Sequence, residues 1–255
     1  MASLFPFLSP DQLLFAFSIA VIAGVVKGVV GFAMPMILVS GLGTFLPPEL
    51  ALAGLILPTL VTNGMQALRN GMAAALASIY RFRWFMGIGM VFLVASAQLF
   101  RVLSGPSLYL LIGVPVTIFA VLQLRGWQLR LQGQSKRADI TIGTIAGAIG
   151  GVSGVWGPPT VAYLTAINTP KAEQMRTQGV IYGLGAVVLL FSHMGSGVMT
   201  AEVAPFSAIL IIPAVLGMWA GRQIQDRIDQ GAFRRVTLLV LLIAGLNLVR
   251  RGLGF

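Results

Sequence analysis

Apolar runs long enough to cross a lipid bilayer recur along the whole of this 255-residue chain. A membrane-spanning helix needs about 20 consecutive, mostly apolar residues. Eight segments meet or approach that length: residues 12–45, 49–68, 84–101, 107–124, 139–168, 172–194, 203–221 and 236–250. The pattern predicts an all-α polytopic membrane protein, organised as a single membrane domain over residues 1–255.

Composition supports this class and narrows the chemistry. Hydrophobic residues make up 57% of the chain and charged residues 9%, whereas soluble domains are about 45–50% apolar and about 25% charged. There is no cysteine and only one histidine, so no metal site and no cofactor is expected. The net charge of +10 could indicate nucleic acid, but the basic residues lie between apolar runs, as in the cytoplasmic loops of membrane proteins. No nucleic-acid partner is therefore expected.

An internal repeat divides the chain. When the sequence is shifted by 123 positions, residues 19–35 overlay residues 142–158, and eight of the seventeen positions are identical. These are Ile19/Ile142, Ile22/Ile145, Ala23/Ala146, Gly24/Gly147, Gly28/Gly151, Val29/Val152, Gly31/Gly154 and Pro35/Pro158. The match predicts a first repeat over 12–124, a basic linker over 125–138 and a second repeat over 139–251. Each repeat then holds four segments, of which the first is glycine-rich and broken by proline.

The distribution of basic residues favours one topology over another. Eight ordinary crossings would place nine basic loop residues on one side and seven on the other. If the broken first segment of each repeat instead enters and leaves on the same side as two half-helices, the repeats are inverted. Thirteen basic residues (within 69–83, 125–137, 171–176 and 222–235) then share one side, and Arg101, Arg250 and Arg251 the other. The positive-inside rule favours six crossings plus two re-entrant segments, with both termini outside; eight ordinary crossings remain the alternative.

The two broken segments are the predicted binding site. Glycine and proline interrupt helices, and broken backbone at membrane depth occurs where it is buried in protein or lines a cavity. Half-helices starting near Pro35 and Pro158 would direct N–H groups and positive dipole ends toward an anion. The candidate substrate-binding residues are Lys27, Gly28, Gly31, Phe32, Pro35, Asn63, Gly151, Ser153, Gly154, Trp156, Pro158, Arg176 and Gln178.

Several of these candidates also have a purely structural interpretation. The glycines could serve close helix packing, and Asn63 could hydrogen-bond between helices without touching substrate. Lys27 has no carboxylate near it in sequence; a charge at such a position costs at least about 2.5–3.5 kcal/mol and indicates function, unless the side chain reaches the membrane surface. Arg176 could belong to an ordinary cytoplasmic flank.

Several activities lack their residues. No Asp or Glu lies centrally in a segment, which argues against a carboxylate proton relay. No Walker-type glycine loop is present, and the single histidine excludes a metalloprotease of the His-Glu-x-x-His type. Serine hydrolysis at Ser153 would need His193 as its base and is a weak alternative.

The glycine-rich stretches resemble those of the sulfite exporter TauE/SafE family of bacterial membrane transporters. The residues that carry the resemblance are Lys27-Gly28-x-x-Gly31-Phe32 running to Pro35, Gly147-x-x-Gly150-Gly151-x-x-Gly154 running to Pro158, the basic linker, and Gly217-x-x-x-Gly221-Arg222. The resemblance implies a secondary transporter in the bacterial inner membrane for sulfite, sulfonates or related organic acids, with a midplane site at the repeat interface.

One departure from the family pattern concerns the second break. The family often has a glycine-rich run before its second proline, whereas this chain has Val155-Trp156-Gly157-Pro158-Pro159. A tryptophan there would narrow or reshape a cavity, so the substrate cannot be carried over from the family. The alternative function is a non-transporting assembly or scaffold protein of the membrane.

Overall fold

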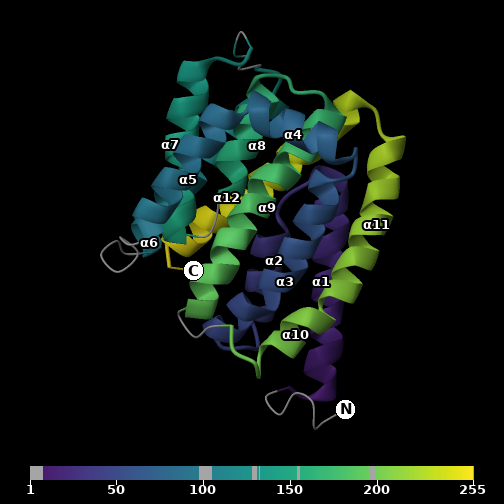
Figure 1. Cartoon of the computed structure of the whole chain (residues 1–255). Coiled ribbons are helices and arrows are strands. Elements are labelled where there is room, and N and C mark those ends of the chain that lie inside the picture. Colours follow the sequence, from purple (N-terminus) through teal and green to yellow (C-terminus); the bar gives the residue numbers. More distant parts are fainter. Residues whose placement is uncertain are drawn as a thin grey trace. The chain divides into compact units, whose positions relative to one another are not determined.

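The computed structural model describes residues 8–97, 105–127, 131, 133–153, 156–195 and 199–254, and over these residues the regular structure is entirely α-helical (Figure 1). The helices form two compact units that are interleaved in sequence. The first unit comprises Met1–Arg69 and Gly179–Ile228, and the second comprises Asn70–Gln178 and Asp229–Phe255. Each unit therefore contains helices from both halves of the chain.

Among the described residues, the first unit contains five helices and the second part of a sixth. They are α1 (Pro10–Val30), α2 (Met34–Leu42), α3 (Pro48–Ala67), α10 (Ala204–Ile209), α11 (Ile211–Arg227) and, from Gly179 onward, α9 (Lys171–Gly195). Helices α1, α2, α3, α10 and α11 share a hydrophobic core in which Leu38, Leu42, Phe206 and Leu210 are fully buried. Three of the four α1 residues in this core are alanines, Ala16, Ala20 and Ala23, which lets the neighbours of α1 approach closely.

Helix α1 has clear start and stop signals and a close partner. Ser9 caps its first turn in a reciprocal capping box with Gln12, and Gly31 ends it in the left-handed conformation. Its main neighbour is α11 (Figure 1). A Cβ on Gly28 would stand 2.8 Å from the amide nitrogen of Arg222, so the glycines of this contact let two backbones touch.

After α1 the chain folds back on itself. The ring centroids of Phe15, in the second turn of α1, and Phe45, just after α2, are 5.4 Å apart. The end of α2 therefore lies beside the start of α1, and the break at residues 31–33 lies at the opposite end of this helical hairpin.

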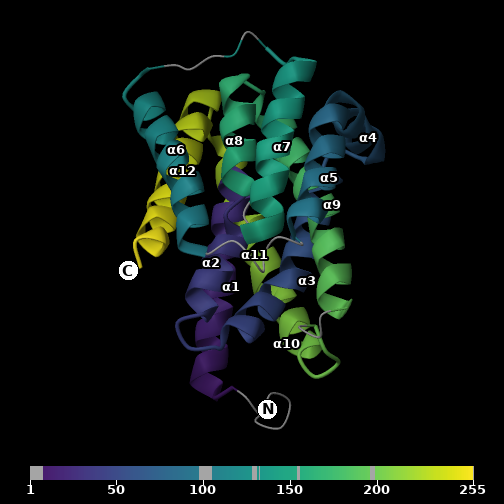
Figure 2. The ribbon, with the colours of Figure 1, turned by 90° about the vertical axis from the view of Figure 1, so that its left-hand side faces the viewer.

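The second unit contains α4 (Met72–Arg81), α5 (Arg83–Ala97), α6 (Gly105–Leu124), α7 (Lys136–Ser153), α8 (Gly157–Ala166), α12 (Gln230–Gly252) and the first turns of α9. Helix α5 packs on α7, and α6 packs on α12 (Figure 2). Glycines again bring the backbones together: a Cβ on Gly147 would stand 2.9 Å from the Cα of Gly89.

Helices α7 and α8 form a second helical hairpin. The backbone N–H of Leu131, which precedes α7, donates to the carbonyl of Ala166 at the end of α8 over 3.0 Å. The start of α7 and the end of α8 therefore lie together. Helices α2 and α8 begin at residues 34 and 157, and helices α3 and α9 begin at residues 48 and 171. The two starts in each pair are 123 positions apart (157 − 34 and 171 − 48).

Two expectations about the helices need correction. The broken first segment is not two half-helices, because α1 has 21 residues and α2 has nine, about 31 and 13 Å at 1.5 Å per residue. Residues 69–83, expected as a loop, include the helix α4. Its apolar residues are spaced to line one face, a pattern too short to stand out in a 20-residue hydropathy window.

Length and composition identify the best membrane-crossing candidates in the described part of the chain. Three helical stretches qualify: Pro10–Val30, Ala204–Arg227 and Gln230–Gly252. Helices α4 and α5 qualify only when taken together, and they are bent by 77° at their junction. The protein is therefore a helical membrane protein in which several segments are short, bent or folded back.

Candidate functional site

The break between α1 and α2 consists of Gly31, Phe32 and Ala33. Gly31 has φ 87°, and its N–H closes the last turn of α1 on the carbonyl of Lys27 over 2.7 Å. Ala33 has φ 73°, a conformation that costs an L-residue with a Cβ about 1–2 kcal/mol. Such strain persists where the surrounding structure enforces it, and here Phe32 and Met34 are buried on either side.

Lys27 lies in the last turn of α1 with 1% of its surface exposed. Its ammonium group donates a hydrogen bond to the side-chain oxygen of Asn63 on α3. Neither of the two ion pairs found among the described residues, Arg69–Asp226 and Arg81–Glu173, involves Lys27. An ammonium group has three donors. Within the described residues, the Lys27 ammonium has the amide oxygen of Asn63 as an acceptor and no carboxylate to balance its charge.

A polar stripe on α3 faces the break. Thr59, Thr62, Asn63 and Gln66 are spaced i, i+3, i+4 and i+7, and all are buried. Gln66 donates from Nε2 to the carbonyl of Gly31 over 3.2 Å, and the Thr62 hydroxyl lies 3.4 Å from the sulfur of Met34. The stripe thus contacts the first residue of the break, Gly31, and the first residue of α2, Met34.

Buried polar groups without a hydrogen-bond partner lie on the stripe that faces this break. Within the described part of the chain, the Nδ2 amide nitrogen of Asn63 and the hydroxyl of Thr59 are buried without a partner. Helix α2 begins at Met34, and its N-cap residue Ala33 provides no side-chain hydrogen bond, so the positive dipole end of α2 is not neutralised locally. A buried cation, an unpaired amide donor and an uncapped helix start all favour an anion.

A protein-family model described as "Sulfite exporter TauE/SafE" matches residues 16–248 of the chain. The protein belongs to the TauE/SafE family. This is a family of membrane transporters rather than of enzymes, so hydrolysis at Ser153 is set aside. No curated protein and no solved structure matches the chain.

The second break of this TauE/SafE-family chain differs from the first in its donors. Helix α8 begins after Trp156 without a side-chain cap, and Pro158 and Pro159 follow in its first turn. Because proline has no N–H, this helix start offers fewer donors than that of α2. A Cβ on Gly150 would stand 2.7 Å from the Trp156 ring, so the tryptophan packs against α7. Gly154 lies outside the described residues, as do the side chains of Gly151 and Ser153.

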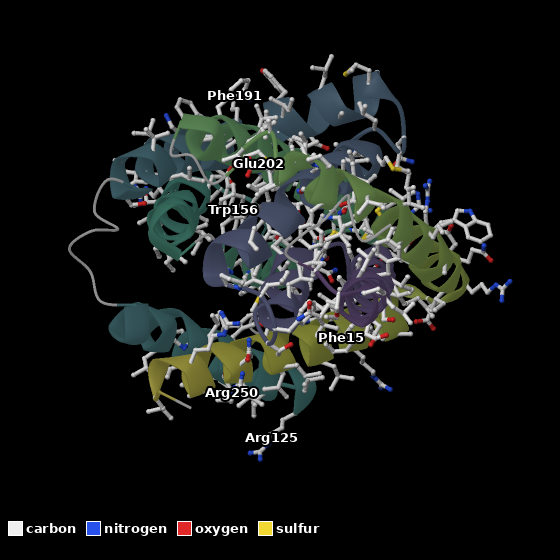
Figure 3. All side chains as sticks on the ribbon, turned by 90° about the horizontal axis from the view of Figure 1, so that it is seen from below. Phe15, Arg125, Trp156, Phe191, Glu202 and Arg250 are labelled. Atoms are coloured by element: carbon white, nitrogen blue, oxygen red, sulfur yellow. The ribbon has the colours of Figure 1, made fainter. Side chains whose placement is uncertain are left out.

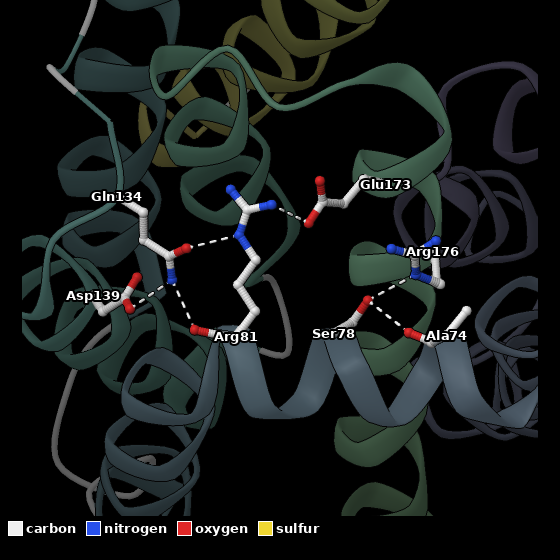
Figure 4. Close-up of polar contacts among 7 residues, drawn as sticks. All are labelled: Ala74, Ser78, Arg81, Gln134, Asp139, Glu173 and Arg176. Atoms are coloured by element: carbon white, nitrogen blue, oxygen red, sulfur yellow. Dashed lines mark hydrogen bonds and ion pairs between the residues drawn. The ribbon is translucent and has the colours of Figure 1, made fainter.

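Arg176 and Gln178 lie on α9 in the second unit. The Arg176 Nε donates to the Ser78 hydroxyl over 2.8 Å, and Gln178 is fully buried. Figure 4 shows Arg176 beside a network in which Arg81 pairs with Glu173 and contacts Gln134. These contacts tie the start of α9 to α4 and to the chain before α7, and Arg176 is one of the side chains that hold α9 on α4.

The structure brings together only part of the predicted site. Lys27, Gly31 and Asn63 meet at the first break; Phe32 is buried within it, and Pro35 is in the first turn of α2. Gly28 faces the backbone of α11, where helix packing accounts for it. Trp156, Pro158, Arg176 and Gln178 belong to the second unit.

Sequence reasoning did not select Thr59 and Thr62, nor did it place Gln66 in the site. Their spacing with Asn63 was nonetheless a usable signal, since four polar residues on one face of an apolar helix require a polar neighbour.

Proposed function

We propose that this protein is a secondary transporter that binds a small anion at the break between α1 and α2. Lys27 supplies the charge, and Asn63 Nδ2, Thr59 and the start of α2 supply further donors. The observation that carries the proposal is the fully buried Lys27 ammonium, which is paired with an amide oxygen and, among the residues that the structure describes, with no carboxylate. Keeping such a charge inside a membrane segment costs at least about 2.5–3.5 kcal/mol, and a bound anion would offset that cost.

Sulfite, sulfonates and related organic acids are the proposed substrates, and the bacterial inner membrane the proposed location. The family membership supports both, and the donor-rich site supports an oxyanion. Such an anion presents several acceptor oxygens and would use the two ammonium donors that Asn63 leaves over. In the inverted topology thirteen basic residues share one side of the membrane, and their positive charge would raise the local concentration of anions there.

We also propose that the halves, 12–124 and 139–251, are inverted structural repeats joined by the linker 125–138. Three observations support this arrangement. The starts of α2 and α8, and of α3 and α9, keep the 123-residue spacing of the sequence match. Each broken segment is a helical hairpin that starts and ends at one end of its own unit. The long first helix of each half packs on a helix of the other half, α1 on α11 and α7 on α5.

The anion site is tested by removing the charge of Lys27. Charge-assisted hydrogen bonds contribute about 1.5–3 kcal/mol, and each 1.4 kcal/mol is tenfold in affinity. Lys27→Met should therefore weaken anion binding about ten- to hundredfold and abolish flux at low substrate concentration. Lys27→Arg should keep partial function, because its charge survives in a different geometry. Ile22→Met, on the exposed face of α1, is the control.

A second variant separates anion binding from packing. Asn63→Asp would give Lys27 the carboxylate that it lacks, and this internal ion pair would compete with a bound anion. We expect Asn63→Asp to fold and to lose anion binding at least as completely as Lys27→Met. The measurements are flux of labelled sulfite, sulfonate and carboxylate in proteoliposomes, and binding to the purified protein. Wild-type affinity in both Lys27→Met and Asn63→Asp would refute the proposed site.

A further inference from the structure

Two cations of the second unit lie over aromatic rings at the junction of α4 and α5. The Arg83 guanidinium carbon is 4.3 Å from the Tyr80 ring centroid, and the Lys136 Nζ is 4.0 Å from that of Trp84. We propose that Tyr80, Arg83, Trp84 and Lys136 bind the headgroup of an anionic phospholipid, while the apolar face of α4 contacts its acyl chains. This lipid site is separate from the anion transport proposed above.

Within the part of the chain that the structure describes, helix α4 has one face packed on the second unit and one exposed, largely apolar face. Its attached face is buried at Ala75 and Ser78 and held by two polar contacts, Ser78 with Arg176 and Arg81 with Glu173. The opposite stripe consists of Met72, Leu76, Ile79 and Tyr80, with Leu76 56% and Tyr80 70% exposed. An amphipathic helix with basic residues beside its apolar face is typical of helices that lie in the membrane interface.

The bend between α4 and α5 agrees with that placement. Helix α4 has ten residues, about 15 Å at 1.5 Å per residue, and it is turned by 77° from α5. If α5 crosses the bilayer upright, α4 lies about 13° from the membrane plane (90 − 77). Tryptophan and tyrosine are enriched at the headgroup level, where this junction would then lie.

The charges at the junction select an anionic partner. Glu173 is paired with Arg81, and both oxygens of the buried Asp139 accept hydrogen bonds, one from Tyr163 and one from Gln134. Neither Arg83 nor Lys136 belongs to an ion pair in the described part of the chain. A second copy of the protein is disfavoured here, because a two-fold contact through this surface would bring the same cations together.

Quenching of Trp84 fluorescence by brominated lipids tests the proposal. In a full-length Trp127→Phe/Trp156→Phe/Trp219→Phe variant, Trp84 is the one remaining tryptophan. Brominated phosphatidylglycerol should quench it at a lower mole fraction than brominated phosphatidylcholine does. Arg83→Gln and Lys136→Gln should each weaken the phosphatidylglycerol effect about fivefold, and together about 25-fold.

The matched control is Arg125→Gln/Arg235→Gln, which removes two exposed charges from the same unit. Arg125 extends away from the helices (Figure 3), and this control should leave the lipid preference unchanged. Equal quenching by the two lipids would overturn the proposal. So would a control variant that weakens the phosphatidylglycerol effect as much as Arg83→Gln/Lys136→Gln does. A dimer by light scattering in which Trp84 is shielded from both lipids would also overturn it. If the double variant does not fold, the fivefold effect of Lys136→Gln decides.

Discussion

Replacing Gly24 with alanine tests the backbone contact between α1 and α11, which positions the helix that carries Lys27. A Cβ on Gly24 would overlap the carbonyl oxygen of Ala214 and stand 2.9 Å from the amide nitrogen of Met218. Both obstacles are backbone atoms, so no side chain can rotate away and the two helices must separate. Overpacking of this kind costs about 1–3 kcal/mol.

Gly64→Ala is the matched control, because Gly64 also lies inside a helix of the first unit and a Cβ added there would meet no atom within 4 Å. Alanine is favoured over glycine in a helix interior by up to about 1 kcal/mol, so this variant should be unchanged or more stable. The difference between the variants is then about 1–4 kcal/mol. At about 2–4 °C per kcal/mol, their melting temperatures should differ by roughly 2–16 °C.

The measurement is thermal unfolding of the purified protein in detergent, followed by fluorescence-detected size exclusion. Gly24→Ala should lower anion flux, because separating α1 from α11 displaces Lys27. Gly64→Ala should retain the flux. Equal melting temperatures for the two variants would refute the close packing of α1 on α11, and the position of Lys27 would then need another explanation.

Three further predictions follow from local geometry. Gly31→Ala should destabilise the break by about 1–2 kcal/mol, because φ 87° is strained for any residue with a Cβ; unchanged stability and flux would contradict this. In the inverted topology, single cysteines at Asn70, Ser135 and Gln230, all exposed in the second unit, should label from the same side of the membrane. The labelling is specific because the chain has no native cysteine. Opposite labelling of Asn70 and Gln230 would favour eight simple crossings. Asp229→Ala should cost about 1 kcal/mol in denaturant unfolding, because Asp229 caps α12 through Ala232, and Asp229→Ser should restore most of it.

The positions of the breaks were readable from sequence, whereas the shapes of the broken segments were not. Hydropathy identified the apolar segments, since burial in lipid demands about 20 apolar residues wherever a helix crosses. The breaks at Gly31–Ala33 and before Gly157 lie where glycine and proline predicted them. Helix α4 was missed because ten residues are too few for a hydropathy window. The uneven lengths of α1 and α2 were missed because glycine and proline mark the position of a break but do not determine the length of the helix on either side.

For the site, the sequence by itself determined that Lys27 lies in an apolar segment beside a break. A charge inside such a segment is costly, so its position along the chain already marks Lys27 as a candidate for function. Only the tertiary structure decided its partners. Lys27 meets Asn63 from 36 residues away, and α1 packs on α11 from the other half of the chain. Helices in lipid associate through the shape of small residues and through single polar contacts, rather than through hydrophobicity. An apolar sequence pattern therefore specifies which helices form, whereas the complementary surfaces of distant helices determine which of them meet.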